Sequence, residues 1–231
     1  MKPILLRTLL PLLPLLSLLL AAACAVKTPQ PPPLPVETGA AWYQQAAKNG
    51  KKVFPIASAQ SLITVTVRRG GALARLGHDH VVASRSVAGF VAPDAGRADF
   101  HFRLDQMTVD EPALRQAAGL DTQPSAEAID GTRTNMLVRV LEAARYPVVM
   151  LHAERVSGNA AMLRLTVTLH GVQRTLEVPA VIEQTPSSVT VSGQFKLLQT
   201  DFGITPMSVM GGAMVVQDPM ELAFKIVARN Q

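Results

Sequence analysis

Two histidines that lie close together in this sequence are the clearest candidates for metal chemistry. His78 and His80 flank Asp79, and residues two apart in an extended segment point to the same side. Paired imidazoles suit Zn, Cu or Ni ions, and His152 and His170 would complete a set of four if the fold brought them together. The pattern therefore leaves open a metal site built from these four histidines, although the domain has no cysteine that could add a thiolate ligand.

Motifs that would indicate an enzyme are missing from the sequence. It contains no Gly-x-Ser-x-Gly turn, no phosphate-binding glycine loop and no His-Glu-x-x-His. Asp79 could orient a neighbouring histidine as a base, but no nucleophile lies nearby in the sequence. Asp201-Phe-Gly203 matches a kinase metal motif, yet nothing else kinase-like accompanies it. We therefore expect a non-catalytic protein without a cofactor.

Cys24, the only cysteine, points to lipid attachment. Lys2 and Arg7 precede an apolar stretch at 9–20, and small residues follow at 21–23, which is the layout of an export signal. Leu-Ala-Ala-Ala-Cys looks like the lipobox of bacterial lipoproteins, in which the cysteine becomes the lipidated first residue. We therefore expect residues 1–23 to be a signal peptide and Cys24 to anchor the protein to a membrane, facing the periplasm of a bacterial cell envelope.

Two alternatives to a lipoprotein stay open at this point. One is soluble export after ordinary cleavage. The other is an uncleaved membrane anchor, because residues 8–26 carry no charge and would span roughly 28 Å as a helix.

A proline-rich segment follows the cysteine. Five prolines fall within the seven positions from Pro29 to Pro35, so this segment can form neither a helix nor a strand ladder. As an extended spacer it would reach up to ~40 Å. We therefore assign residues 24–52 to the lipidated cysteine and a tether, and residues 53–231 to the folded domain.

The distribution of charge argues against a nucleic-acid ligand. The formal charge is +5, and setting aside Lys2 and Arg7 of the signal leaves 20 basic against 17 acidic residues. Basic residues form no run longer than the pairs Lys51-Lys52 and Arg68-Arg69. Nucleic-acid binding usually requires a basic stripe with stacking aromatics, and the sequence has neither.

The elements that must position these residues are mostly strands. Residues 161–169 alternate apolar and polar side chains, His170-Gly171 breaks the run, and residues 172–179 alternate again up to Pro179. This pattern predicts an antiparallel hairpin with one buried face. The other expected elements are strands at 61–69, 81–92, 97–106, 148–156, 188–199 and 220–228, and short helices at 111–119 and 130–144.

These elements predict an all-β fold of about eight antiparallel strands with one or two helices inserted between strands. Because the helices interrupt the strands without alternating with them, a parallel sheet is not indicated. We expect an up-and-down barrel, whose interior could hold one apolar ligand, and a two-sheet sandwich is the alternative.

Four motifs, in matching order and spacing, make the chain resemble the YceI-like family: Leu76-Gly-His78, Tyr146-Pro147, Leu165-Thr-Val-Thr-Leu-His-Gly-Val172 with Arg174, and Asp201-Phe-Gly-Ile204. The resemblance covers about residues 58–228. It implies a lipocalin-like barrel, exported to the periplasm, that encloses a long polyisoprenoid lipid in its bore.

Strand parity identifies the side chains that would contact such a lipid. The large apolar residues expected to face inward are Val65, Val67, Phe90, Phe100, Phe102, Leu104, Val149, Leu151, Leu165, Val167, Leu169, Phe195, Leu197 and Phe224. These residues could form a packed core, which is the usual outcome, or line a cavity if the barrel is too wide for them to meet.

Polar residues at strand ends and turns are the candidates to bind a lipid head group. These are His78, Arg85, His170 and Arg174. The sequence therefore predicts a cell-envelope lipoprotein that binds a hydrophobic lipid and carries, stores or senses it.

Overall fold

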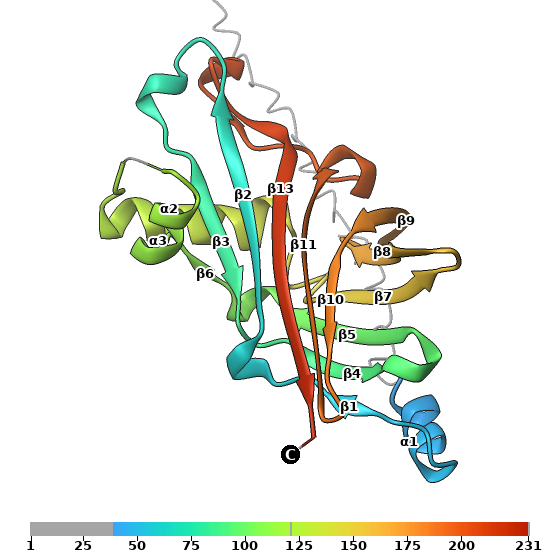
Figure 1. The fold of residues 1–231 in the computed structure, drawn as a ribbon. Helices are drawn as coiled ribbons and strands as arrows, with labels where there is room; N and C mark the ends of the chain where they lie inside the picture. Colours follow the sequence, from blue (N-terminus) through green and yellow to red (C-terminus); the bar gives the residue numbers. More distant parts are fainter. Residues whose placement is uncertain (1–38, 121, 231) are drawn as a thin grey trace, which may run out of the picture. The chain divides into compact units, whose positions relative to one another are not determined.

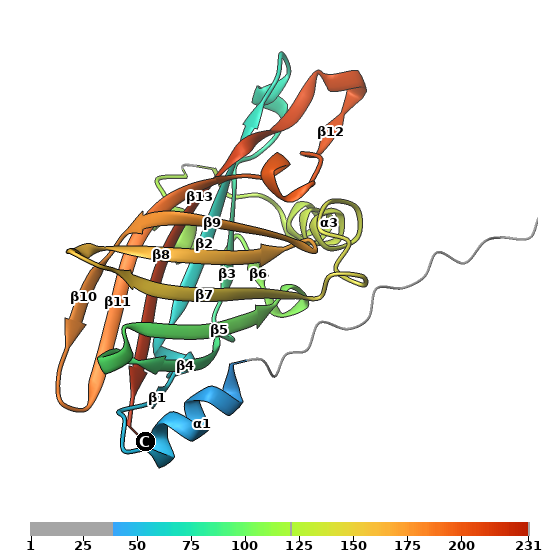
Figure 2. The same ribbon diagram turned by 90° about the vertical axis from the view of Figure 1, so that its right-hand side faces the viewer.

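Two antiparallel β-sheets make up most of the domain (Figures 1 and 2). The structure, a computed structural model, describes residues 39–120 and 122–230. The predicted signal peptide, Cys24 and the proline-rich segment lie outside the described residues. No helix in the described ranges has the length and apolar character needed to cross a bilayer.

The first sheet has six strands in the order β1 (Phe54–Pro55), β4 (Ala88–Ala92), β5 (Arg97–Arg103), β7 (Val148–Val156), β8 (Asn159–Leu169) and β9 (Val172–Pro179). The second sheet has the order β10 (Val181–Gln184), β11 (Ser188–Leu198), β13 (Met214–Arg229), β2 (Leu62–Gly70), β3 (His80–Ser84) and β6 (Thr108–Val109), with β12 (Ser208–Val209) paired to β13. Strands of the first sheet run across those of the second (Figures 1 and 2).

The chain changes sheet at corners, which is how two crossed sheets enclose a shared interior. One corner is the segment 85–87 between β3 and β4, and another is Ala180 between β9 and β10. Gly193 of β11 lies against the second corner, where an added Cβ would stand 2.5 Å from the backbone oxygen of Pro179. A larger residue at this position would push the two sheets apart.

The predicted all-β antiparallel class is confirmed. The hydrogen-bonded ladders form two sheets and do not run around a continuous barrel. In the described part of the chain, an isolated bridge between Ile56 and Ala228 joins them at one end. The β8–β9 hairpin forms as predicted, with Leu165 paired to Leu176 and His170 and Gly171 in the turn.

Two helices lie beside β3 and β6 of the second sheet (Figure 1). They are α2 (Pro112–Ala117) and α3 (Ala126–Asn135), and α3 continues as a π-helical turn, Met136–Val140. The second helix begins earlier than predicted because Ser125 caps it, accepting a hydrogen bond from the N–H of Ala128 at 3.2 Å. Met136 and Val140 pack against the core as expected.

Short 3₁₀ segments complete the described elements: Ser58–Gln60, Ala74–Leu76, Pro93–Ala95, Leu104–Gln106, Thr200–Phe202 and Met210–Gly212.

A further helix, α1 (Ala40–Lys48), packs against the outer face of the first sheet. Tyr43 is 1% exposed, and its hydroxyl donates a hydrogen bond to Asp99 of β5 at 2.8 Å. Arg97 lies over the Trp42 ring at 4.7 Å. The packed domain therefore extends further toward the N-terminus than Val53, the boundary predicted from the sequence.

The inward orientation predicted for Phe90 is wrong. Its ring stacks on Tyr43 outside the sheet, with the ring centroids 5.4 Å apart. The prediction treated residues 81–92 as one strand, but the chain bends at 85–87 and enters the other sheet, so the parity changes. In the observed register Phe90 pairs with Asp99, and Val91 is the residue that faces inward.

Candidate functional site

A cavity of about 300 Å³ lies between the two sheets. Except for Phe90, every residue that strand parity placed inward lines it: Val65, Val67, Phe100, Phe102, Leu104, Val149, Leu151, Leu165, Val167, Leu169, Phe195, Leu197 and Phe224. Whether these side chains contact a lipid stays a prediction. Their positions answer the question left open by the sequence, because the interior is lined and not filled.

The lining side chains are buried by protein to different degrees. Leu165 and Val167 are 5% and 3% exposed and belong to the packed core. Phe100, Leu151 and Phe195 pack against that core but are only partly buried. Their uncovered apolar surface faces the cavity, so a ligand that covered it would gain about 25 cal/mol for each Å² removed from water.

Among the described residues, the polar residues of the lining are His80, Arg97, Thr132, Asn135, Arg155 and Gln199, although the Arg97 side chain lies over Trp42 on the outer face of the sheet. Three of these are engaged elsewhere. Arg97 pairs with Asp99 at 2.8 Å, Arg155 donates to the side-chain oxygen of Gln184 at 3.1 Å, and the Gln199 amide donates to the backbone oxygen of Gln217 at 2.9 Å. His80, Thr132 and Asn135 form a group of their own at the end of the cavity beside α3.

His80 is held by a buried carboxylate. Its Nδ1 lies 2.6 Å from Asp110, whose side chain is fully buried. Asp110 also accepts hydrogen bonds from the Val81 N–H at 3.0 Å and from Arg115 at 2.7 Å. Burial alone would raise the pKa of Asp110, but the hydrogen bonds from His80, Val81 and Arg115 outweigh it and lower the pKa below its ordinary value. Asp110 is therefore a carboxylate, and Nδ1 of His80 carries the proton that it donates.

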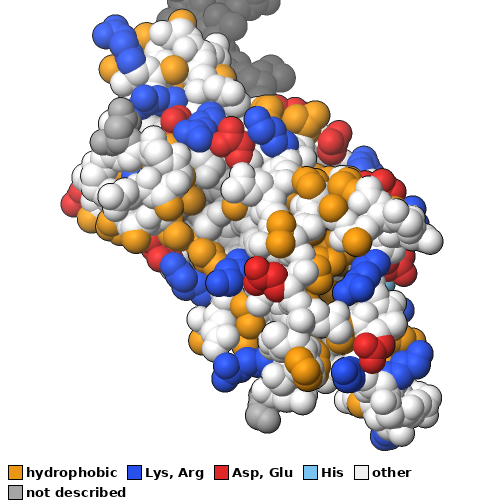
Figure 3. All heavy atoms as spheres, viewed as in Figure 1, with side chains coloured by type: hydrophobic (Ala, Val, Ile, Leu, Met, Phe, Trp, Pro, Cys, Tyr) orange, Lys and Arg blue, Asp and Glu red, His pale blue; other side chains and the backbone are white. Residues whose placement is uncertain are grey.

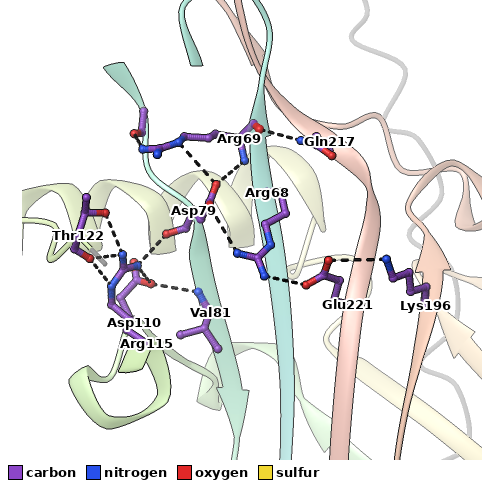
Figure 4. A network of polar contacts seen from close by, with 11 residues as sticks. Arg68, Arg69, Asp79, Val81, Asp110, Arg115, Thr122, Lys196, Gln217 and Glu221 are labelled. Atoms are coloured by element: carbon purple, nitrogen blue, oxygen red, sulfur yellow. Dashed lines mark hydrogen bonds and ion pairs between the residues drawn. The ribbon is translucent and has the colours of Figure 1, made fainter. Parts of the chain in front are cut away.

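Arg115 ties this carboxylate to the neighbouring loops (Figure 4). The guanidinium is 2% exposed and also donates to the backbone oxygens of Asp79 and Thr122. The Asp79 side chain in turn binds the Arg69 backbone N–H at 2.8 Å and lies 3.5 Å from Arg68. These contacts fix the segment that carries His80 and leave its ring little freedom to turn.

The outer face of the second sheet carries paired charges. Arg68 binds Glu221 at 2.9 Å, and Lys196 lies 3.8 Å from the same carboxylate (Figure 4). On the face drawn in Figure 3, blue and red side chains are interspersed and form no single basic patch. Pairs of this kind on a surface contribute little to stability.

The four residues predicted to bind a head group do not line the cavity, which corrects that prediction. Arg85 is exposed and pairs with Glu111 at 2.9 Å. Arg174 is exposed on the edge strand β9. His170 occupies the hairpin turn, where its ring packs 4.5 Å from Tyr146. His78 precedes β3, and its buried Nδ1 has no hydrogen-bond partner among the described residues.

The four histidines that the sequence left open as an alternative metal site do not come together. His78 and His80 lie together with ring centroids 6.2 Å apart, but His152 is on the outer face of the first sheet and His170 is in the hairpin turn. Within the ranges that the structure describes, no group of three or more His, Cys, Asp or Glu side chains could hold a metal ion. Strand parity explains the separation, because His152 pairs with Asp99 on the face opposite Leu151.

His152 belongs instead to a polar cluster beneath α1. Its Nδ1 lies 2.6 Å from Asp99, which also receives hydrogen bonds from Tyr43 and Arg97. Burial would raise the pKa of Asp99, but the bonds from Arg97, Tyr43 and His152 lower it overall. Burial raises the pKa of Tyr43, and the Asp99 carboxylate raises it further. The cluster attaches α1 to the outer face of the first sheet.

Sequence reasoning missed Thr132 and Asn135 and gave His80 only as a metal ligand. Two patterns could have found them. His80 lies two residues before Val82 and pairs with Val67, so it shares the inward face of β3. Thr132 lies one turn before Met136 on the apolar stripe of the helix, and Asn135 follows three residues later.

Comparisons with known proteins agree with this fold. A family model for the YceI-like domain matches residues 57–228. The structure of a polyisoprenoid binding domain from Saccharophagus degradans, implicated in plant cell wall breakdown, is similar over 77% of this chain and 98% of that one, with a TM-score of 0.56 and 12% identity. Burkholderia cenocepacia BcnA is similar over 75% of this chain and 99% of its own, with a TM-score of 0.50 and 14% identity.

No curated protein matches the chain. At these identities the two solved structures show a common fold. The family model goes further, because it spans most of the chain and includes the strands that surround the cavity and the segment that carries His80. The chain therefore belongs to the YceI-like family.

Proposed function

We propose that this chain is a lipoprotein of the bacterial cell envelope whose cavity binds one hydrophobic lipid of the polyisoprenoid type without altering it chemically. The apolar cavity between the sheets carries this proposal. Further support comes from the Saccharophagus degradans domain of the same fold, which is described as polyisoprenoid binding.

A long hydrocarbon suits this lining. Each methylene that moves from water into the cavity would contribute about 0.8 kcal/mol. The partly buried surfaces of Phe100, Leu151 and Phe195 supply the contacts. A hydrocarbon chain forms no hydrogen bonds, and three of the six polar residues of the lining already have protein partners. The protein would thereby shield an insoluble molecule from water and carry, store or sense it.

Binding without catalysis fits the composition of the lining. Among the described residues it includes no Ser, Cys, Lys, Asp or Glu. Asp110, His80 and Thr132 are arranged like the acid, base and nucleophilic hydroxyl of a catalytic triad. Nε2 of His80 lies 3.4 Å from the Thr132 hydroxyl. Thr132 lies inside α3, however, where the helix uses the backbone N–H groups, so these groups cannot form an oxyanion hole beside its hydroxyl.

Attachment through Cys24 and a periplasm-facing position complete the proposal. They rest on the N-terminal sequence, which places a lipobox-like motif before a proline-rich segment. The anchor would hold the binding domain within reach of a membrane that contains its ligand.

Native mass spectrometry of the full chain, purified from bacterial membranes, tests the proposal. We expect a complex with one apolar lipid that is released on activation in the gas phase. The matched control is Ala153→Trp, which would fill the cavity from β7 and should purify without lipid. A wild-type chain that carries no lipid, and takes up none from added polyprenol, would contradict the proposed function.

A further inference from the structure

We infer that the cavity recognises a lipid whose polar end is a neutral hydroxyl, which hydrogen-bonds to Nε2 of His80 beside Thr132 and Asn135. This inference rests on the proposed function, because it names the chemical end of the lipid that the cavity would hold. It distinguishes a polyprenol from a polyprenyl phosphate.

The first step is the orientation of the His80 ring. Nδ1 donates to the buried Asp110 carboxylate at 2.6 Å, so Nε2 is the nitrogen directed toward Thr132. Both residues line the cavity. With Nδ1 engaged by Asp110, Nε2 is the ring nitrogen that remains for a ligand, and a hydroxyl is a partner that can pair with it.

The second step is the hydrogen-bonding capacity that remains at Nε2 of His80. The Thr132 hydroxyl lies 3.4 Å from Nε2, which is a long contact that leaves this nitrogen available to a ligand. Asn135 lies one turn further along α3, and its side chain also lines the cavity. A ligand hydroxyl could donate to His80 and accept from Thr132 or Asn135. Few other polar groups of the lining are as free, because Arg97 and Gln199 are engaged by Asp99 and Gln217.

The third step is the charge at this end. The side chain of Asp110 is fully buried directly behind His80, and Arg115 neutralises it while also binding two backbone oxygens. Arg133, the other cation nearby on α3, donates to the backbone oxygen of Asp105. A phosphate placed against His80 would therefore find no free cation in these two arginines, so its charge would stay unpaired and its affinity would fall by about tenfold or more.

Arg155 is the alternative position at which the polar end of the lipid could bind. It lies at the rim beside the β7–β8 hairpin, is exposed, and spans to Gln184 of the other sheet. A phosphate could bind there in water, but an exposed guanidinium would select it weakly. His80 is 14% exposed and fixed by the fully buried Asp110, which favours the end beside α3.

Binding of three probes of equal chain length tests the inference: a polyprenol, its monophosphate and the hydrocarbon in which hydrogen replaces the hydroxyl. We expect the wild-type chain to bind the alcohol more than about tenfold more tightly than the phosphate. His80→Phe should weaken the alcohol roughly fivefold, the value of one net hydrogen bond, and leave the hydrocarbon unchanged. Thr132→Val, which keeps the side-chain shape and disturbs no buried charge, should act in the same direction.

The outcomes separate the two proposals. If no probe binds, the proposed function fails. If the alcohol and the hydrocarbon bind but both variants leave their affinity ratio unchanged, the hydroxyl site is refuted and lipid binding stands. Tighter binding of the phosphate, lost in Arg155→Gln, would overturn the inference in favour of an anionic end at the hairpin rim.

Discussion

Replacing Asp110 by Asn should destabilise the domain far more than replacing Asp105 by Asn. Both carboxylates lie 2.7 Å from an arginine, but the Asp110–Arg115 pair is 0% and 2% exposed whereas the Asp105–Arg103 pair is 50% and 47% exposed. Removing one partner of a buried pair costs about 3–5 kcal/mol because the other charge stays buried and unpaired. An exposed pair contributes at most about 1 kcal/mol.

Thermal unfolding followed by circular dichroism measures this difference. For a domain of this size each kcal/mol corresponds to about 2–4 °C, so the melting temperature should fall by about 6–20 °C in Asp110→Asn and by no more than about 4 °C in Asp105→Asn. Equal melting temperatures for the two variants would refute the claim that the buried carboxylate holds the His80 segment in place.

The pH dependence of unfolding supplies a second test of the Asp110→Asn variant. The pKa of Asp110 in the folded state lies below its ordinary value of 3.8, so its stabilisation is complete above that value and is lost as the pH falls through the folded-state pKa. The gap between wild type and Asp110→Asn should stay constant between about pH 5 and pH 7 and shrink in stronger acid. A gap that widens on acidification would contradict the assignment of a depressed pKa.

Three further variants test the fold and the anchor. Leu165→Asp should lower the free energy of unfolding in urea by at least about 2–5 kcal/mol, which is the cost of the lost side chain alone. Arg164→Ala on the outer face should change it by less than about 1 kcal/mol. Similar effects of the two variants would mean that our assignment of the two faces is wrong. Gly193→Ala should lower the free energy of unfolding by about 1–3 kcal/mol, because its Cβ would meet the backbone at the corner between β9 and β10. Gly131→Ala in α3 has open space around its Cβ and should stabilise the domain by about 0.4–1 kcal/mol. An unchanged stability of Gly193→Ala would mean that the two sheets are not closely packed at this corner. Cys24→Ala should abolish labelling with a radioactive fatty acid, and retained label would exclude this cysteine as the lipidated residue.

Local alternation was enough to predict most strand faces but not the path between strands. Leu165 and Val167 face inward as predicted, because the alternation along the hairpin is interrupted only at its turn. Phe90 was misplaced because the bend at 85–87 contains neither Gly nor Pro, so nothing local indicates a change of sheet. The cavity itself depends on the separation of the two sheets, which strand patterns do not encode.

The polar end of the cavity depends on contacts between distant segments. Asp110 reaches His80 across 30 positions, and Arg115 reaches the backbone of Asp79 across 36. The His78-Asp79-His80 pattern suggested metal chemistry because sequence spacing does not reveal that the acidic partner of His80 is Asp110. Helical spacing could have placed Thr132 on the inward stripe, but only the packing of α3 brings it to His80.

Photo-crosslinking with a diazirine-bearing polyprenol, followed by peptide mass spectrometry, tests the central claim most directly. We predict saturable crosslinks to residues of the cavity lining, such as Leu151 and Phe195, that excess unlabelled polyprenol removes. Crosslinks confined to the exposed apolar side chains Leu76, Val138 and Met210 would show that the lipid binds the surface and would contradict the account.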